Sequence, residues 1–182
     1  MKAEAKFSIA GLCLALIVAG CATVPDKPEG RTVLSAQVKE AIAIFRAEDP
    51  SIQRFFDKSY GYAVLPKIFK AAFWIGGAGG RGEVYEKGKM IGYCKLSQAS
   101  LGFSFGGEFF REIIFFRDGP DLDKFRVNEL TFSAQATGVV LTAGVAAKTD
   151  YKDGMAVFVL TDAGLMLDVS LAGQHFDYFP GY

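Results

Sequence analysis

Apolar residues return every three to four positions from Leu34 onward, with charged residues between them. This spacing is typical of a helix with one apolar face. We therefore predict an amphipathic helix that starts at Leu34 and ends near Glu48. Asp49 followed by Pro50 matches an N-cap and first-turn pair, so a second short helix is expected directly after it.

The apolar pattern changes to that of strands after Gly61. Compact apolar runs cover residues 62–65 and 71–75, with Pro66 between them, and are expected to form separate strands. The segment that follows indicates a hairpin turning at Gly88. Residues 101–105 alternate large apolar residues with glycine and serine, which favours a strand with one bare face.

The second half of the chain continues this pattern. Residues 113–116 favour a strand over a helix, and residues 121–130 predict one short helix led by an aspartate. The runs 156–160 and 165–171 are expected to form an antiparallel pair joined by a turn at 162–164. The predicted fold class is α+β, with N-terminal helices packed on a mostly antiparallel, Gly-rich β-sheet or partial barrel.

The N-terminus has the organisation of a secretory signal. Basic residues lead into an apolar run over 7–19, which is too short to span a bilayer comfortably. The sequence Val18-Ala19-Gly20-Cys21 resembles the lipobox of bacterial lipoproteins, in which the peptidase cuts before a cysteine that receives lipid. The alternative is an ordinary signal peptide with a chance cysteine. We expect cleavage before Cys21 and lipidation of Cys21 with acyl chains such as palmitate.

The predicted organisation is a signal peptide over 1–20, a flexible tether over 21–33 and one domain over 34–182. The tether segment is rich in proline and charge and has no apolar period. The residue after the expected lipidated cysteine is Ala22. An aspartate at this position would resemble an inner-membrane retention signal. The expected location is therefore the cell envelope, on the outer membrane and facing the periplasm.

Composition excludes some classes of partner. The chain has 20 basic and 20 acidic residues, so no general attraction to nucleic acid is expected. After cleavage the only cysteines would be Cys21 and Cys94, and lipidation would modify Cys21. The exported domain is therefore expected to depend on its apolar core and not on a disulfide.

Three possible chemical motifs are weak. Gly77, Gly79 and Gly82 match G-x-G-x-x-G, but the next residues favour a strand where a dinucleotide site needs a helix. His175 is the only histidine, and no nucleophile motif accompanies it, so a structural or surface role is expected. Cys94 is expected to be a buried, inert thiol. We predict no metal, no cofactor and no enzymatic activity.

Basic residues are concentrated between positions 67 and 95. If the strands bring them together, they would form a cationic patch for anionic phospholipid headgroups. A solvated surface that carries lysine for solubility is an equally good interpretation. The candidate lipid-binding residues are Lys67, Lys70, Arg81, Lys87, Lys89 and Lys95.

Several short segments follow one another in the order seen in a known kind of domain. They are residues 59–67, 71–73, 76–82, 100–102 and 106–107, the segment around Phe125, the small-residue stretch around Gly138 and Gly144, and residues 164–165 and 169–173. Over about residues 35–175 the chain therefore resembles the SYLF-domain family. Members of that family are described as phospholipid-binding modules, with actin binding in eukaryotic members, and many bacterial members are short lipoproteins. Glu108 and Phe109 depart from the usual pattern. The resemblance implies the α+β fold and lipid binding, whereas an envelope protein would not meet actin.

The leading hypothesis is a lipid-anchored envelope protein with a non-enzymatic, SYLF-like domain that binds anionic phospholipid membrane. The second is a structural or assembly lipoprotein whose exposed face binds another envelope protein. A stoichiometric partner in a pull-down, or no binding to vesicles of any composition, would favour the second.

Overall fold

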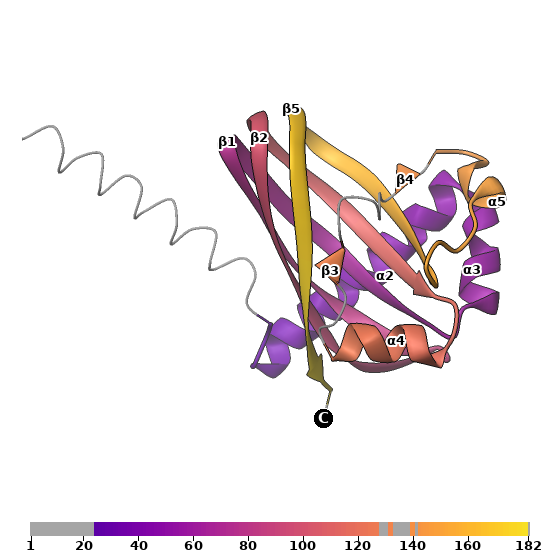
Figure 1. The fold of residues 1–182 in the computed structure, drawn as a ribbon. Coiled ribbons are helices and arrows are strands. Elements are labelled where there is room, and N and C mark those ends of the chain that lie inside the picture. The colour runs from indigo at the N-terminus through magenta and orange to yellow at the C-terminus, as the bar shows by residue number, and fades with distance from the viewer. Residues whose placement is uncertain (1–23, 128–130, 133–138, 141, 182) are drawn as a thin grey trace, which may run out of the picture.

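The computed structural model describes residues 24–127, 131–132, 139–140 and 142–181. Figure 1 shows three long strands side by side with helices around them. The elements in chain order are α2 (Pro28–Glu48), η1 (Pro50–Ile52), α3 (Gln53–Lys58), β1 (Gly61–Glu86), β2 (Lys89–Phe116), α4 (Gly119–Arg126), β3 (Thr131–Phe132), β4 (Val139–Val140), α5 (Val145–Lys148) and β5 (Met155–Pro180).

The strands form one sheet in the order β1-β2-β5-β3, and β4 also pairs with β5. The β4–β5 pairing is parallel and the other pairings are antiparallel. Helices packed on this mostly antiparallel sheet confirm the predicted α+β class. Among the described residues, no helix is long and apolar enough to span a bilayer.

The hairpin between β1 and β2 turns at Lys87 and Gly88. Both residues have positive φ, 49° and 77°, as a two-residue type I′ turn requires. Glycine adopts this conformation without a steric penalty. The predicted turn at Gly88 is confirmed.

β1 is one strand, so the prediction of separate strands on either side of Pro66 is wrong. The register with β2 shifts between Leu65 and Ile68, which places Pro66 in a β-bulge. Proline is tolerated there because a bulge on an edge strand does not need its missing N–H. The apolar runs on both sides therefore pair with the same neighbour.

β5 is also continuous, so the predicted turn at 162–164 is wrong. The register with β2 steps from Thr161 to Ala163, leaving Asp162 as the extra residue of a bulge. The Asp162 carboxylate pairs with Arg111 of β2, with Oδ1 and Nη1 2.8 Å apart. β5 pairs with β2 both before and after this bulge, so the polar residues do not reverse the direction of the chain.

β1 folds back so that its two halves lie backbone against backbone. A Cβ atom on Gly82 would overlap the Val64 carbonyl oxygen, and one on Gly80 would meet the backbone of Lys67 and Ile68. The glycines of this segment therefore permit a close chain approach instead of binding a phosphate. The G-x-G-x-x-G match lies wholly within β1, and the next element is the strand β2, where a dinucleotide site needs a helix.

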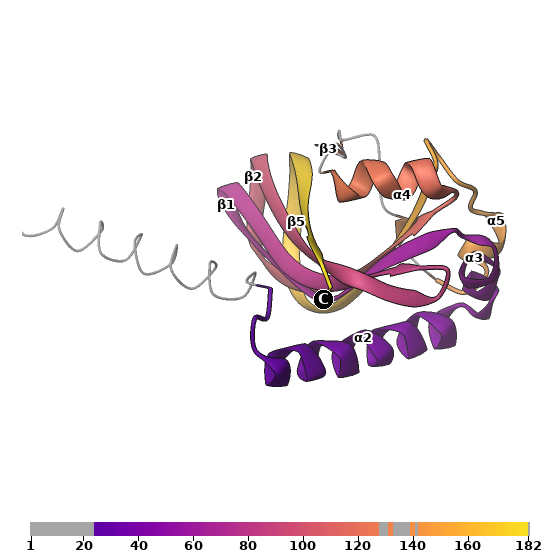
Figure 2. The same ribbon diagram turned by 90° about the horizontal axis from the view of Figure 1, so that it is seen from below.

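Two apolar clusters lie on opposite faces of the folded sheet. The inner cluster joins side chains from both halves of β1 and β2, and Leu122 and Phe125 of α4 cover it. The outer cluster lies beneath α2, α3 and α5. Figure 2 shows α2 along the outside of the curved sheet and α4 on the other side.

α2 begins at Pro28, six residues before the predicted start, so the predicted tether over 21–33 is wrong from residue 28 onward. Proline fits the first helical turn because its missing N–H has no helical acceptor. Pro25 is buried, and its carbonyl accepts a hydrogen bond from Arg31 Nε at 3.1 Å. These contacts tie the start of α2 to the preceding segment. The predicted end at Glu48 is confirmed.

The short helices have aspartate caps. Asp49 accepts the Ser51 backbone N–H at the start of η1, as the sequence predicted. α4 begins at Gly119 and ends at Arg126, so the predicted span of 121–130 is wrong at both ends. Its cap is Asp118, whose side chain accepts the Asp121 N–H at 3.2 Å.

Candidate functional site

A groove lies between α2 and the outer face of the sheet, where the helix crosses the two halves of β1. It has two adjoining chambers, with volumes of about 370 Å³ and about 240 Å³. Gln37 of α2, Pro66 and Lys67 of β1, and Phe109 of β2 line both chambers.

The larger chamber combines cations with apolar walls. Lys67 and Arg81 line it, and none of the described residues that line it is acidic. Lys67 Nζ lies 4.6 Å from the centroid of the Phe109 ring. The Phe109 and Phe69 rings are 5.0 Å apart between centroids. This chamber can therefore hold a negative group beside an apolar one.

The smaller chamber carries both signs of charge. It is lined by the Arg111–Asp162 ion pair together with Glu40 and Lys67. Burial raises the pKa of Asp162, and this effect outweighs the opposing influence of the cations Arg111 and Lys67. The acidic side chains of the groove are thus confined to one end.

The six candidate cations do not form one patch. Arg81 and Lys95 are paired across β1 and β2, on the α2 side of the sheet with Lys67. Lys70 lies on the opposite side of β1 from Lys67. On this inner face its ammonium is 3.8 Å from the Glu108 carboxylate. The prediction of a single patch is therefore wrong for Lys70, because the pleat separates it from Lys67.

Lys87 and Lys89 lie at the β1–β2 hairpin turn, away from the groove. Both are exposed, and Lys87 Nζ lies 4.8 Å from the Tyr60 ring centroid. Three of the candidates, Lys67, Arg81 and Lys95, therefore share the α2 face.

A buried carboxylate holds α2 onto the sheet. Glu83 of β1 is 1% exposed and accepts hydrogen bonds from the Ser35 hydroxyl of α2 and, at 2.6 Å, from the Tyr85 hydroxyl. Burial raises the pKa of Tyr85, as does its bond to Glu83. These contacts set the position of the helix that forms one wall of the groove.

Sequence reasoning missed Gln37, Phe109 and Arg111 as lining residues. Arg111 and Phe109 alternate with inward-facing residues of β2, so strand alternation was an available signal. Gln37 gave no such signal. Its position over the groove depends on how α2 crosses the sheet, which is a tertiary property.

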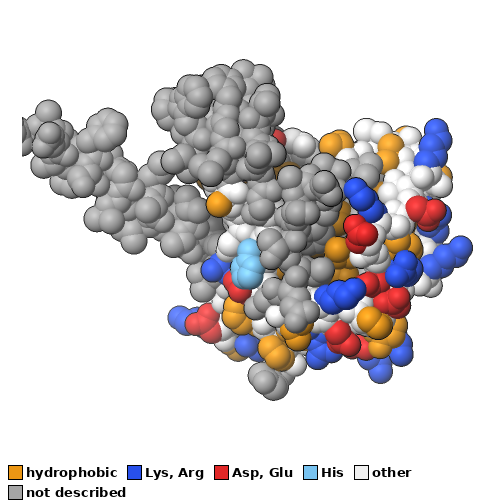
Figure 3. All heavy atoms as spheres, viewed as in Figure 1, with side chains coloured by type: hydrophobic (Ala, Val, Ile, Leu, Met, Phe, Trp, Pro, Cys, Tyr) orange, Lys and Arg blue, Asp and Glu red, His pale blue; other side chains and the backbone are white. Residues whose placement is uncertain are grey.

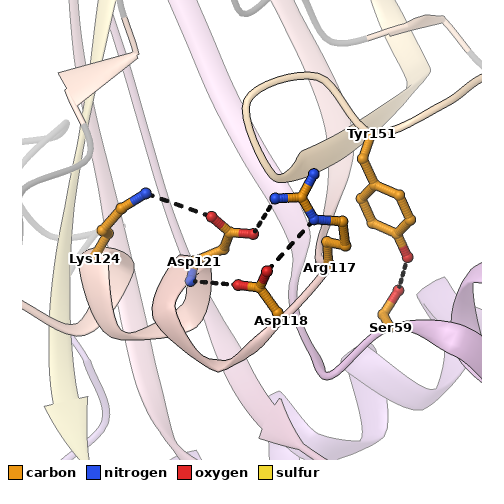
Figure 4. Close-up of polar contacts among 6 residues, drawn as sticks. All are labelled: Ser59, Arg117, Asp118, Asp121, Lys124 and Tyr151. Carbon is orange, nitrogen blue, oxygen red and sulfur yellow. Dashed lines mark hydrogen bonds and ion pairs between the residues drawn. The ribbon is translucent and has the colours of Figure 1, made fainter.

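A second polar cluster surrounds α4 and is shown in Figure 4. Asp121 is 5% exposed and lies 3.7 Å from Arg117 and 3.5 Å from Lys124. The hydroxyls of Ser59 and Tyr151 lie 2.6 Å apart nearby. A Cβ on Gly154 would overlap the Asp121 carboxyl group. The cluster joins α4 to the start of β5, and its charges are paired, so we assign it a structural role.

The inner face also buries a carboxyl group. Glu112 is 1% exposed. Its Oε2 accepts a hydrogen bond from Gln174 Nε2 at 3.2 Å, whereas its Oε1 has no hydrogen-bond partner among the residues that the structure describes. The Gln174 amide also bonds Gln98 at 3.3 Å. Burial raises the pKa of Glu112 to about 7, and the Gln174 bond opposes this effect.

Cys94 and His175 are placed as the sequence predicted. Cys94 is fully buried, and burial raises the pKa of its thiol, as an inert core cysteine requires. His175 is exposed and lies 3.3 Å from Asp177. It is the pale blue side chain in Figure 3, on a face where acidic and basic residues are interspersed. Cys21 lies outside the described residues. Within those residues, no group of three potential ligands is placed to hold a metal ion.

The fold and groove define a class of protein: an α+β domain with a folded-back antiparallel sheet and a helix-covered, partly cationic groove. No model of a known protein family matches the chain. It is similar to Beta cell expansion factor A of Aeromonas veronii, with 30% identity over 151 residues, which are 81% of this chain and 57% of that protein. The chain thus spans little more than half the length of this relative.

Proposed function

We propose that this chain is an envelope lipoprotein whose SYLF-like domain binds anionic phospholipid without catalysing a reaction. The observation that carries the proposal is the position of Lys67, Arg81 and Lys95 on the α2 face, beside a chamber whose described lining includes no acidic residue. Similarity to Beta cell expansion factor A and the SYLF-like segments support the family assignment.

The anchor is the second part of the proposal. The sequence Val18-Ala19-Gly20-Cys21 supports cleavage before Cys21 and lipid attachment to its thiol, on the periplasmic side of the outer membrane. Metabolic labelling with palmitate in a bacterial host tests it. Label that is absent from Cys21→Ser but present in the unaltered chain supports the anchor, and equal labelling of both contradicts it.

Lipid binding is tested by co-sedimentation of residues 22–182 with neutral and anionic vesicles at low and high salt. Binding should increase with anionic lipid and weaken with salt. Each lysine or arginine near an anionic surface contributes about 1 kcal/mol, so Lys67→Ala with Arg81→Ala should weaken binding roughly 30-fold. Lys58→Ala with Lys148→Ala is the matched control, because both lysines are exposed and neither lines the groove.

The contrary result is a lack of binding at every lipid composition. The Cys21 anchor would then be the only membrane contact proposed, and the alternative of an assembly lipoprotein that binds another envelope protein would take its place. Equal losses in the groove variant and the control would contradict the location but not the binding.

A further inference from the structure

The charges that line the α2 groove are unequal at its two ends. Lys67 and Arg81 line the larger chamber, whereas Glu40 and Asp162 lie at the other end with Arg111. Among the described residues that line the two chambers, three side chains are cationic and two are carboxylates. The groove as a whole suits a ligand with a single negative charge, placed toward Arg81.

The size of the groove limits what can enter it. Small-ligand pockets usually have volumes of about 300–1,000 Å³. The larger chamber, at about 370 Å³, is at the lower end of that range. It has space for a headgroup and the first part of an acyl chain, but not for two complete chains. Leu34, Phe69 and Phe109 would contact the apolar part.

The carboxylates oppose a second negative charge. Asp162 is already paired with Arg111 at 2.8 Å, so this arginine is not fully available to a ligand. Glu40 is exposed and lines the same end. A headgroup with an additional ionised phosphate oxygen would place negative charge toward these side chains in a partly enclosed site, where repulsion is stronger than in bulk water.

We infer that the α2 groove binds one phospholipid molecule at a time through a monoanionic phosphodiester, held between Lys67 and Arg81, and that Glu40 selects against dianionic headgroups. The inference rests on the proposed lipid-binding function and deepens it. It predicts saturable binding of one lipid molecule per chain. A charged patch, by contrast, would bind vesicles without a defined site for one lipid.

The first test uses residues 22–182, which contain all of the described core, and dihexanoyl phosphatidylglycerol below its micelle concentration, without vesicles. Isothermal titration should show saturable binding with one site per chain. Lys67→Gln with Arg81→Gln should weaken it about tenfold or more, since hydrogen bonds to charged groups contribute most of such a contact. Lys58→Gln with Lys148→Gln, an equal change of charge at two exposed lysines outside the groove lining, should leave it unchanged.

The second test measures selectivity. Dihexanoyl phosphatidic acid at pH 8 carries close to two negative charges on its terminal phosphate and should bind the unaltered chain more weakly than phosphatidylglycerol. Glu40→Gln should reduce this difference severalfold, because it removes one opposing carboxylate. Glu48→Gln, at the far end of the same helix, should preserve the difference.

The outcomes separate the two proposals. Vesicle binding without saturable binding of the short-chain lipid overturns the single-lipid site and leaves the proposed function intact. Equal effects of the groove and control substitutions, or unchanged selectivity in Glu40→Gln, also overturn it. A folding defect is recognised by circular dichroism, and Lys67→Gln alone, on an exposed side chain, then provides the test.

Discussion

A carboxyl group in an apolar core makes stability depend on pH, and Glu112 is such a group. Burial raises its pKa from 4.5 to about 7 in the folded chain. The folded state therefore retains a proton that the unfolded state loses between these values. The stabilisation from Glu112 is fully present below pH 4.5 and is lost as the pH rises through about 7.

Glu112→Gln should remove this pH dependence. Each pKa unit corresponds to about 1.4 kcal/mol, so the contribution of Glu112 to the unfolding free energy should fall by about 3 kcal/mol over that range. The near-isosteric glutamine should show a flatter profile. Urea unfolding at a series of pH values measures it, with Glu108→Gln as the control on the same strand. Parallel profiles for the unaltered chain and Glu112→Gln would contradict the assignment.

Gly82→Ala should destabilise the fold strongly, because the added methyl group would overlap the Val64 carbonyl oxygen. Overpacking typically costs about 1–3 kcal/mol, and a backbone contact allows little relief. Gly77→Ala is the matched control, since its nearest neighbour outside the adjoining residues would be the Gln98 carbonyl oxygen at 3.5 Å. Thermal unfolding compares them, and equal melting temperatures would refute the close approach.

At the scale of elements, α2 depends on its hydroxyl contact with β1. Ser35→Ala should leave the buried Glu83 carboxylate with one partner fewer and cost about 1–3 kcal/mol. Amide hydrogen exchange should become faster across α2. Thr32→Ala, which removes only an exposed bond to the Pro28 carbonyl, should have little effect. Equal exchange in both variants would argue against this contact as an attachment point.

Asp49 joins three helices, because its carboxylate accepts from the Ser51 N–H and hydroxyl and from the Ala146 N–H at 2.8 Å. Burial by itself would raise the pKa of Asp49, but these hydrogen bonds outweigh it and lower the pKa. Asp49→Ala should cost about 1–2 kcal/mol or more. Chemical denaturation measures the loss, and Asp57→Ala on exposed α3 surface is the control. A smaller loss than in the control would contradict this role.

Local signals predicted the elements that local contacts determine. The Asp49 cap and the turn at Gly88 depend on residues within a few positions and were found. The bulges at Pro66 and Asp162 were interpreted as breaks between strands, because their polar or proline residues resemble turns. Whether such a segment bulges or turns is decided by continued pairing with β2, which the sequence alone does not show.

The same reasoning explains the partial success at the site. Lys67 and Arg81 are far apart in sequence and converge because β1 folds back. Lys70 is separated from Lys67 by strand alternation after the bulge at Pro66. Composition could predict a cluster of cations, whereas its division between two faces depends on the register.

At the scale of the whole molecule, Cys94 reports on opening of the folded sheet. It lies between the two halves and is the single cysteine of residues 22–182. Labelling by a thiol reagent should therefore be limited by global unfolding and should accelerate in Gly82→Ala by the factor expected from its stability loss. Mass spectrometry over time measures the rate. Rapid labelling of the unaltered chain would show a local opening instead.

The fold-back of β1 also protects the protein from its own copies. A 26-residue edge strand is long enough to recruit another chain through its unpaired amides and carbonyls. Here Gly82 lies directly against the Val64 backbone. The Lys87 N–H, just after the end of β1, donates a hydrogen bond to the carbonyl of Tyr60, just before its start. These close contacts occupy part of the edge, so we expect Gly82 to disfavour pairing with a second copy as well as to permit the fold.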